Sequence, residues 1–244
     1  MSARRQVCLT VHAERLHETP VWHAVRRLAG RLERAGRQAT FLVSPLRASV
    51  AGVDLGPRLR EIAARGHEVG QHTHYYALAT GAGRPSFEKR TDASPENVRR
   101  CLDHDHARLL AAGIRPRGFV AGAWTIDDTA REWLVEHGFE YDLSFRSFRL
   151  GYDNPAAAAG DGCDDPCVRG GLLALPTTAT LASAVRRALA RGERAHEVIY
   201  VHDYDLTALR ARLLLAALER VAEPAAWVTV GASEARRSAG RAAA

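Results

Sequence analysis

Lysine is almost absent from this 244-residue chain, because Lys89 is the only one among 34 basic residues and all the others are arginine. The formal net charge of +6 would by itself suggest a nucleic-acid partner. However, the arginines are scattered among glutamates on helix-like stretches such as residues 26–34, and no aromatic residues interleave with them as a base-stacking surface requires. We therefore expect a solvated face laced with ion pairs and no nucleic-acid partner.

Long apolar runs, linkers and repeats are also missing. No run approaches the roughly 18 apolar residues that cross a bilayer, and the first residues lack the apolar stretch of a signal peptide, so we expect no membrane insertion and a cytoplasmic location. No Gly/Ser-rich linker divides the chain, and no repeat of 20–50 residues is visible. The sequence predicts one domain over residues 1–232 and a flexible Ala- and Arg-rich tail over residues 233–244.

Cysteine is scarce, with four residues. Cys8 and Cys101 lie in strand and helix patterns and are expected to be small buried hydrophobic residues. Cys163 and Cys167 bracket an acidic loop at a spacing that favours a loop disulfide or an accidental pair over a metal site, and in a reducing compartment the thiols should be free. The loop at residues 152–170 is a candidate lid or partner surface.

Strand-like and helix-like segments alternate along the chain. The expected strands are residues 6–12, 39–44, 68–71, 117–121, 139–142, 172–175, 198–202 and 227–230, and the expected helices are residues 20–36, 57–65, 94–113, 127–137, 181–191 and 206–221. This alternation predicts an α/β fold with a parallel sheet, either a barrel or an open doubly wound sheet. No Gly-x-Gly-x-x-Gly or Walker loop follows a strand, which disfavours nucleotide folds.

Polar side chains gather where these strands end. His72 and His74 are two residues apart on an extended segment and point to the same side, so their nitrogens can converge on a divalent ion such as zinc. The other strand ends carry His12 and Glu14, Trp124, Asp142, and His202 with Asp203. Because the carboxyl ends of parallel strands share one rim, we expect these groups to lie together.

Each of these residues also has a purely structural interpretation. Glu14 could open a helix, Asp142 could be a turn residue, His202 could be an ordinary hydrogen-bonded histidine, and Trp124 could pack in the core. Three further histidines are expected to be structural or solvated. They are His67, which would cap a turn, and His104 and His106, on the exposed side of a helix.

Five segments, in order over residues 6–203, resemble the motifs of the polysaccharide deacetylases, the NodB-homology group of family 4 carbohydrate esterases. They are LTVHAE (9–14), GHEVGQHTHYY (66–76), GFVAGAW (118–124), LVEHGFEYDLS (134–144) and VIYVHDYDL (198–206). The resemblance implies a distorted (β/α)7-type barrel and a metal-dependent hydrolase that removes acetyl groups from amino sugars.

The chemistry of amide hydrolysis assigns roles to these residues. Glu14, His72 and His74 would hold a divalent metal ion, with zinc the first choice, and leave positions open for water and substrate. His202 would protonate the leaving amine, and Asp142 would orient a nearby imidazole. Trp124 and Tyr75 would stack on a sugar ring.

Three positions depart from the family pattern. His12 stands where the family usually has an aspartate, Val120 stands where it has an arginine, and Tyr76 occupies the usual place of the second metal-binding histidine. An arginine that keeps a carboxylate base ionised would depress the basicity of an imidazole, so the first two changes agree with each other. The hypothesis is that His12 is the base or an extra metal ligand. The rival interpretation is a decayed site.

Two functions therefore remain open. The first is a deacetylase that acts on a small or activated amino sugar or a glycosylated metabolite. The second is a catalytically inactive carbohydrate-binding or scaffold domain. The sequence does not distinguish between the two, and it does not specify the oligomeric state.

Overall fold

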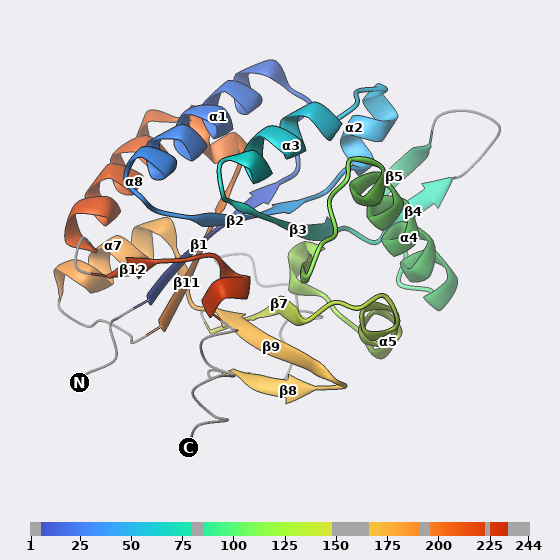
Figure 1. Cartoon of the computed structure of the whole chain (residues 1–244). Coiled ribbons are helices and arrows are strands. Elements are labelled where there is room, and N and C mark those ends of the chain that lie inside the picture. Colours follow the sequence, from blue (N-terminus) through green and yellow to red (C-terminus); the bar gives the residue numbers. More distant parts are fainter. Residues whose placement is uncertain (1–5, 80–84, 148–165, 191–195, 223–224, 234–244) are drawn as a thin grey trace.

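Parallel strands and the helices that connect them curve around a common interior (Figure 1). The computed structural model describes residues 6–79, 85–147, 166–190, 196–222 and 225–233. The parallel strands of the main sheet are β1 (Gln6–Ala13), β2 (Ala39–Val43), β3 (Glu68–Thr73), β6 (Gly118–Ala121), β7 (Tyr141–Arg146), β9 (Leu172–Thr177), β10 (Ala179–Thr180) and β11 (His196–His202).

The order of pairing makes this sheet a barrel rather than an open sheet. β1, β2, β3, β6 and β7 are successive neighbours, β7 pairs with β9, and β11 pairs with both β10 and β1. Residues 172–180 run through β9 and then β10, so this one stretch of chain joins the two ends of the sheet. Counted this way, seven parallel strand positions surround the interior, which confirms the predicted (β/α)7-type architecture.

Helices cover the outside of the barrel and end at glycines or prolines close to where the periodicity predicts. They are α1 (Thr19–Arg34), α2 (Leu46–Ala51), α3 (Gly56–Ala64), α4 (Pro95–Ala111), α5 (Asp128–Glu136), α7 (Leu181–Leu189) and α8 (Leu209–Val221). The short helix α2 and an antiparallel hairpin of β4 (Tyr76–Ala79) and β5 (Ser86–Thr91) are not predicted by the sequence patterns. Nor is β8 (Cys167–Arg169), which pairs antiparallel with β9.

Strand periodicity assigns alternate side chains to the barrel interior and to the helices. The interior cluster contains Cys8, Leu42, Val120, Tyr141 and Leu143 among its buried members. Their neighbours along the strands pack outward in two separate clusters, one beneath α1, α3 and α8 and one beneath α4 and α5. A residue's place in this alternation therefore decides whether it can reach the interior of the barrel.

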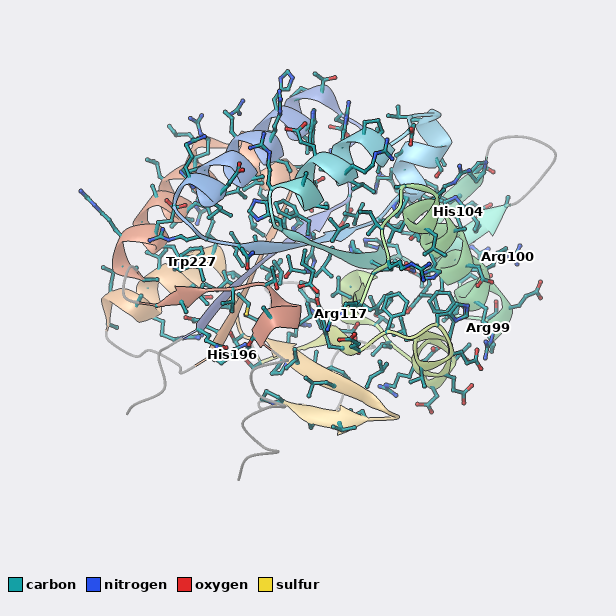
Figure 2. All side chains as sticks on the ribbon, in the orientation of Figure 1. Arg99, Arg100, His104, Arg117, His196 and Trp227 are labelled. Atoms are coloured by element: carbon teal, nitrogen blue, oxygen red, sulfur yellow. The ribbon has the colours of Figure 1, made fainter. Side chains whose placement is uncertain are left out.

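The last described segment of the chain closes the end of the barrel at which the parallel strands begin. The predicted final strand is shorter than expected and reduces to β12 (Ala226–Trp227), which pairs with β1. Val230 and Ser233 are buried, and the Ser233 hydroxyl lies 2.7 Å from His196 Nε2 (Figure 2 labels His196 and Trp227 at this end). Ser233 thus belongs to the folded domain, whereas the remainder of the predicted tail lies outside the described residues.

Ion pairs lace the arginine-rich helices, as the sequence predicts. Arg26 and Arg65 both bind Glu61, at 2.6 and 2.9 Å, and Arg31 binds Glu219 at 3.1 Å. No helix among the described residues is long and apolar enough to span a membrane. Cys8 and Cys101 are buried, as predicted, while Cys163 and most of the candidate lid loop lie outside the described part of the chain.

Candidate metal centre and active site

The register of two neighbouring strands places His12 beside His202. β1 and β11 are parallel and pair His12 directly with His202, so both rings lie at the carboxyl end of the barrel. Their ring centroids are 5.7 Å apart and nearly perpendicular. Glu14 follows β1 by one residue and lies on the same face as His12 because residues two apart on an extended chain share a face.

His72 and His74 approach the same place from β3. His72 Nδ1 lies 3.0 Å from the carbonyl oxygen of Val120, its register partner on β6. A carbonyl only accepts, so Nδ1 carries the proton and a neutral His72 presents a lone pair at Nε2. That Nε2 atom is buried and has no hydrogen-bond partner among the described residues. It is therefore available as a ligand.

His74 occupies space that only a glycine leaves free. A Cβ atom at Gly122, in the turn η1 (Gly122–Trp124) after β6, would lie 2.3 Å from His74 Nδ1. The Tyr76 ring stacks on the other side of His74, with centroids 4.9 Å apart and an interplanar angle of 4°. The imidazole is thus held between a bare backbone and an aromatic ring.

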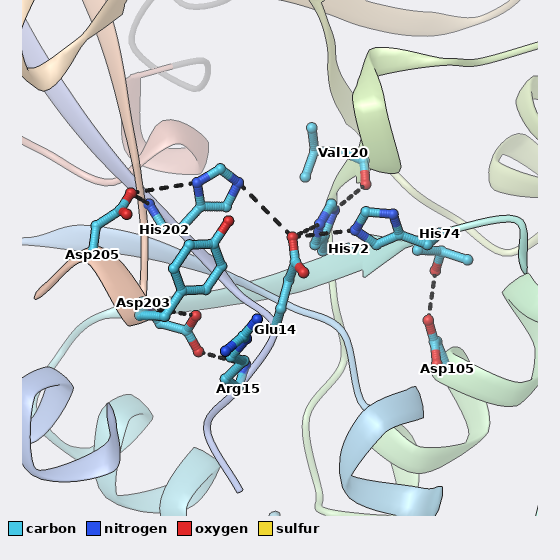
Figure 3. A network of polar contacts seen from close by, with 11 residues as sticks. Glu14, Arg15, His72, His74, Asp105, Val120, His202, Asp203 and Asp205 are labelled. Atoms are coloured by element: carbon cyan, nitrogen blue, oxygen red, sulfur yellow. Dashed lines mark hydrogen bonds and ion pairs between the residues drawn. The ribbon is translucent and has the colours of Figure 1, made fainter. Parts of the chain in front are cut away.

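Glu14 lies between the imidazoles of both groups (Figure 3). Its Oε1 atom is 3.2 Å from His74 Nε2, 3.5 Å from His72 Nε2 and 3.8 Å from His202 Nε2. Burial acts to raise the pKa of Glu14, but the neighbouring imidazoles of His72 and His74 outweigh this effect and hold that pKa far below its usual range. The carboxylate is therefore ionised.

The donor set of Glu14, His72 and His74 fits a divalent metal ion. One ligand atom from each residue lies within 4.8 Å of the others, and the unpaired Nε2 of His72 belongs to this set. Two imidazole nitrogens and one carboxylate oxygen are the ligand types of catalytic zinc sites that keep a position open for water. The i, i+2 spacing on β3 thus suffices to bring both imidazoles to Glu14, although position 76 is a tyrosine.

His12 lies next to this group but is not part of it. Its ring centroid is 5.1 Å from that of His72, yet its nitrogens do not join the cluster of mutually close ligand atoms. Its Nε2 atom is buried without a hydrogen-bond partner in the described chain. Burial, followed by the nearby His72 and His202, lowers the pKa of His12 well below its ordinary value, so the ring is neutral.

Two aromatic residues enclose His12. Trp124 and Tyr200 have ring centroids 5.7 and 5.3 Å from it, and they pack edge to face on each other at 5.0 Å. Ala123 and Trp124 both have φ of +54°, a left-handed conformation that side-chain-bearing residues rarely adopt, so the turn directs the indole into the site at the cost of backbone strain. Trp124 thus reaches the site, but at 9% exposure it packs against His12 and offers little face for a sugar.

Two predicted site residues face the wrong way. Asp142 lies between Tyr141 and Leu143 on β7, whose side chains fill the interior of the barrel, so the Asp142 side chain points outward. It accepts hydrogen bonds from the amide and the hydroxyl of Ser144, and no imidazole in the described chain binds it. Tyr75 alternates with His74 and is buried in the outer cluster under α4 and α5. The proposed roles of Asp142 beside an imidazole and of Tyr75 against a sugar are therefore wrong.

The three histidines that the sequence assigns outside the site make contacts within the fold. His67 is buried, as a capping role predicts, and lies 3.0 Å from the Ala29 carbonyl oxygen through Nε2. His104, labelled in Figure 2, and His106 are not solvated as predicted. His104 Nδ1 lies 3.0 Å from the Asp105 carboxylate, and His106 Nδ1 lies 3.3 Å from the Gln71 side chain.

Two carboxylates position the site: Asp205 is not singled out by the sequence, and Asp203 is expected there only as a polar residue at the end of its strand. Asp205 Oδ2 accepts the backbone N–H of His202 at 3.3 Å and lies 3.5 Å from His202 Nδ1. Asp203 Oδ2 accepts the Arg15 amide at 2.7 Å and so holds the segment that carries Glu14. Burial raises the pKa of Asp203 to about 6. The only sequence signal for this pair is their closeness to His202.

The chain resembles solved structures of other proteins, although its sequence matches no family model. Neither a protein-family model nor a curated protein sequence matches the chain. A family 4 carbohydrate esterase from Streptomyces lividans, in complex with acetate, matches with a TM-score of 0.54 at 14% identity over 91% of this chain and 88% of that one. A variant of a peptidoglycan deacetylase from Bacillus subtilis matches with a TM-score of 0.59 at 16% identity over 98% and 94%.

The chain has the fold of the family 4 carbohydrate esterases. The same fold includes a family 4 pseudoenzyme from Bacillus anthracis, which matches with a TM-score of 0.54 at 13% identity over 91% of this chain and 62% of that one. The family 4 fold therefore accommodates both active and inactive proteins. The residues at the carboxyl end of this barrel have to carry the functional argument.

Proposed function

We propose that this protein is a metal-dependent hydrolase that removes an N-acetyl group from an amino sugar or a glycosylated small molecule. The observation that carries the proposal is the convergence of Glu14 Oε1 with the Nε2 atoms of His72 and His74 at the carboxyl end of a family 4 barrel. The acetate bound to the Streptomyces lividans esterase is consistent with this product class.

Glu14, His72 and His74 would hold the divalent ion, with zinc the first choice from the donor types. Bound there, the ion would supply Lewis-acid polarisation of the acyl oxygen and a more acidic water. His72 keeps its Nε2 lone pair directed to this point because its Nδ1 is tied to the Val120 carbonyl. The hydrogen bond from β6 therefore selects the tautomer that can bind a metal.

His12 and His202 would share the proton transfers. His12 is neutral, with an unpartnered buried Nε2, so it can take the proton that the attacking water loses. His202 lies on the other side of Glu14, its Nδ1 facing Asp205, so its Nε2 can deliver a proton to the leaving nitrogen. The absence of an arginine at Val120 supports this assignment, since a cation there would weaken an imidazole base.

The substitution variants that test this proposal separate metal binding from catalysis. We expect one zinc ion per chain, and acetate release from N-acetylated sugars that a chelator abolishes. His72→Ala and His74→Ala should lose the zinc ion, whereas His12→Ala and His202→Ala should retain it and lose acetate release by about 100-fold or more. His23→Ala, on the exposed face of α1, is the matched control and should behave as the parent protein.

The alternative is a catalytically inactive carbohydrate-binding or scaffold domain. It is favoured by the loss of the family's aspartate and arginine at His12 and Val120 and by the pseudoenzyme with the same fold. A purified protein without metal, whose melting temperature does not respond to zinc and which releases no acetate from any sugar, would replace the hydrolase proposal with this one.

A further inference from the structure

Two polar residues alternate with the histidine ligands on β3 and point away from the metal centre. Gln71 and Thr73 are both 0% exposed, and they lie on the face of the strand opposite His72 and His74. That face packs against α4, which supplies hydrogen-bond partners for both. A buried amide or hydroxyl costs free energy unless it is hydrogen-bonded, so these side chains tie the strand to the helix. Neither residue has a role in the hydrolysis described above.

A buried carboxyl on α4 holds the hydroxyl of Thr73. Thr73 Oγ1 donates to Asp105 Oδ2 at 3.0 Å, and Figure 3 shows Asp105 beside the strand that carries both histidine ligands. Asp105 is 2% exposed, and its second oxygen, Oδ1, accepts from His104 Nδ1 at 3.0 Å. Because each oxygen of the carboxyl has its own donor, the orientation of Asp105 is fixed. Asp105 therefore fixes the side chain that lies between the two ligands.

Gln71 adds a second link between the strand and the helix. Its Nε2 atom donates to Thr73 Oγ1 at 3.1 Å and to the Leu102 carbonyl oxygen at 3.2 Å. Its Oε1 atom accepts from His106 Nδ1 at 3.3 Å. The Gln71 amide and the Thr73 hydroxyl thus have partners for all their polar atoms, and the partners outside β3 all lie on α4. A buried network that is fully hydrogen-bonded is rigid.

The histidine ligands lie where the sheet stops holding β3. The pairing of β3 with β2 ends at Gln71, and its pairing with β6 ends at Thr73. His72 is therefore paired on one side only, and His74 follows the last paired residue of the strand. The side-chain hydrogen bonds to α4 thus supply a restraint on this segment that the sheet does not supply.

We propose that Asp105 is a positioning residue of the metal centre, which acts through Thr73 to hold both histidine ligands against Glu14. The proposal rests on the proposed metal centre and adds to it a residue on the outer side of the barrel wall. Ligand atoms have to be held within about 0.5 Å of their productive positions, so a loosened end of β3 lowers the affinity for the metal ion.

Zinc affinity, measured by competition with a chromophoric chelator, tests the proposal in four variants. Thr73→Val removes the hydroxyl and keeps the shape, and the amide of Asp105→Asn can accept from only one of the two donors. Both variants should bind zinc about 10- to 100-fold more weakly than the parent protein. Thr73→Ser keeps the hydroxyl and should stay within about twofold of the parent.

Thr40→Val is the matched control. Thr40 is also 0% exposed on a strand, and its hydroxyl also donates to a carboxylate, that of Glu68, at 3.0 Å. Because it lies at the closed end of the barrel, Thr40→Val should lose stability and keep the zinc affinity of the parent protein. The visible absorption of the Co²⁺-loaded protein adds a readout of ligand geometry: its bands should shift in Thr73→Val and stay unchanged in Thr40→Val.

The outcomes distinguish this proposal from the function on which it rests. Parent-like zinc affinity and Co²⁺ bands in Thr73→Val, or in a folded Asp105→Asn, overturn the positioning role and leave the hydrolase proposal standing. An equal loss of zinc affinity in Thr40→Val also overturns it, because the loss would then follow stability alone. A parent protein that binds neither ion rejects the positioning role together with the metal centre. If Asp105→Asn does not fold, the comparison of Thr73→Val with Thr73→Ser decides.

Discussion

The orientation of Asp142 decides whether its role is catalytic or structural. Burial raises the pKa of this carboxyl to about 6, while hydrogen bonds from Ser144 oppose the rise. The same Ser144 hydroxyl accepts the Ala121 amide at 2.8 Å, just before the turn that carries Trp124. Asp142 therefore supports the backbone of β6 and β7 from outside the barrel, and its titration should be seen in stability rather than in catalysis.

The stability of the protein should depend on pH through Asp142. Between about pH 4 and pH 6 the folded state keeps a proton that the unfolded chain has released, so the free energy of unfolding falls as the pH rises. Asp142→Asn removes this titration. Relative to the parent protein, the variant should gain about 3 kcal/mol over that range, since two pKa units correspond to about that energy. Urea unfolding at pH 4, 5, 6 and 7 measures the difference.

A second variant should enlarge the effect of pH on stability. Ser144→Ala removes a hydroxyl that donates to the Asp142 carboxylate, so the pKa of Asp142 should rise further and the loss of stability should extend above pH 6. Unfolding curves of Asp142→Asn and the parent protein that shift in parallel at every pH would contradict the assignment of this titration to Asp142.

At the scale of elements, the sequence identifies those with strong periodicity and misses those that depend on tertiary contacts. α1 and α4 have apolar stripes and terminal prolines or glycines, and both lie within a few residues of their predicted bounds. α2 is only six residues long, and the exposed β5 has few apolar residues, so neither produces a recognisable pattern. The bending of β9 into β10, which closes the barrel, has no local signature either.

The candidate site follows the same division. The sequence brings Glu14, His72 and His74 together because the ends of parallel strands share a rim, a rule that needs only the element types. The prediction is wrong for Asp142 and Tyr75 because a shift of one residue along a strand moves a side chain to the opposite face of the sheet. The sequence predicts the bounds of a strand with an error larger than one residue, so it does not determine the face. Asp205 belongs to a turn after β11 whose geometry depends on packing against α1, so its contact with His202 could not be predicted.

The turn after β6 should control metal binding. In Gly122→Ala the new Cβ would overlap the His74 ring, so the imidazole has to leave its position and the affinity for zinc should fall by about tenfold or more. Zinc titration against a chromophoric chelator measures this. Gly36→Ala is a control with a different cost: its φ of +63° is strained for alanine, yet no atom lies within 4 Å of the added Cβ. Equal zinc affinity for Gly122→Ala and the parent protein would remove Gly122 from this role.

On the scale of the whole molecule, the barrel has an end that carries the candidate site and a closed end, and the same strands contribute to both. β1 carries Cys8 near the floor and His12 at the rim, and β3 carries Glu68 at the floor and His72 at the rim. Each of these strands therefore packs at the closed end of the barrel and positions a histidine of the candidate site at the other end. On the outer face of the barrel, Arg26 and Arg65 pair with Glu61, and Arg31 pairs with Glu219.

Glu68 should hold the last described segment at the closed end of the barrel through hydrogen bonds. Its Oε2 atom accepts the Gly231 amide and the Thr40 hydroxyl, both at 3.0 Å, and Thr40 in turn accepts the Val230 amide at 2.9 Å. Glu68→Gln replaces the charged acceptor with a neutral amide oxygen, so the hydrogen bonds from both donors weaken, which should cost about 2 kcal/mol of unfolding free energy. The amides of Val230 and Gly231 should then exchange hydrogen with solvent much faster, while the control variant Glu61→Gln, on the half-buried outer side of α3, leaves them protected. Unchanged exchange at both amides in Glu68→Gln would show that apolar packing of Val228 and Val230 alone closes this end of the barrel.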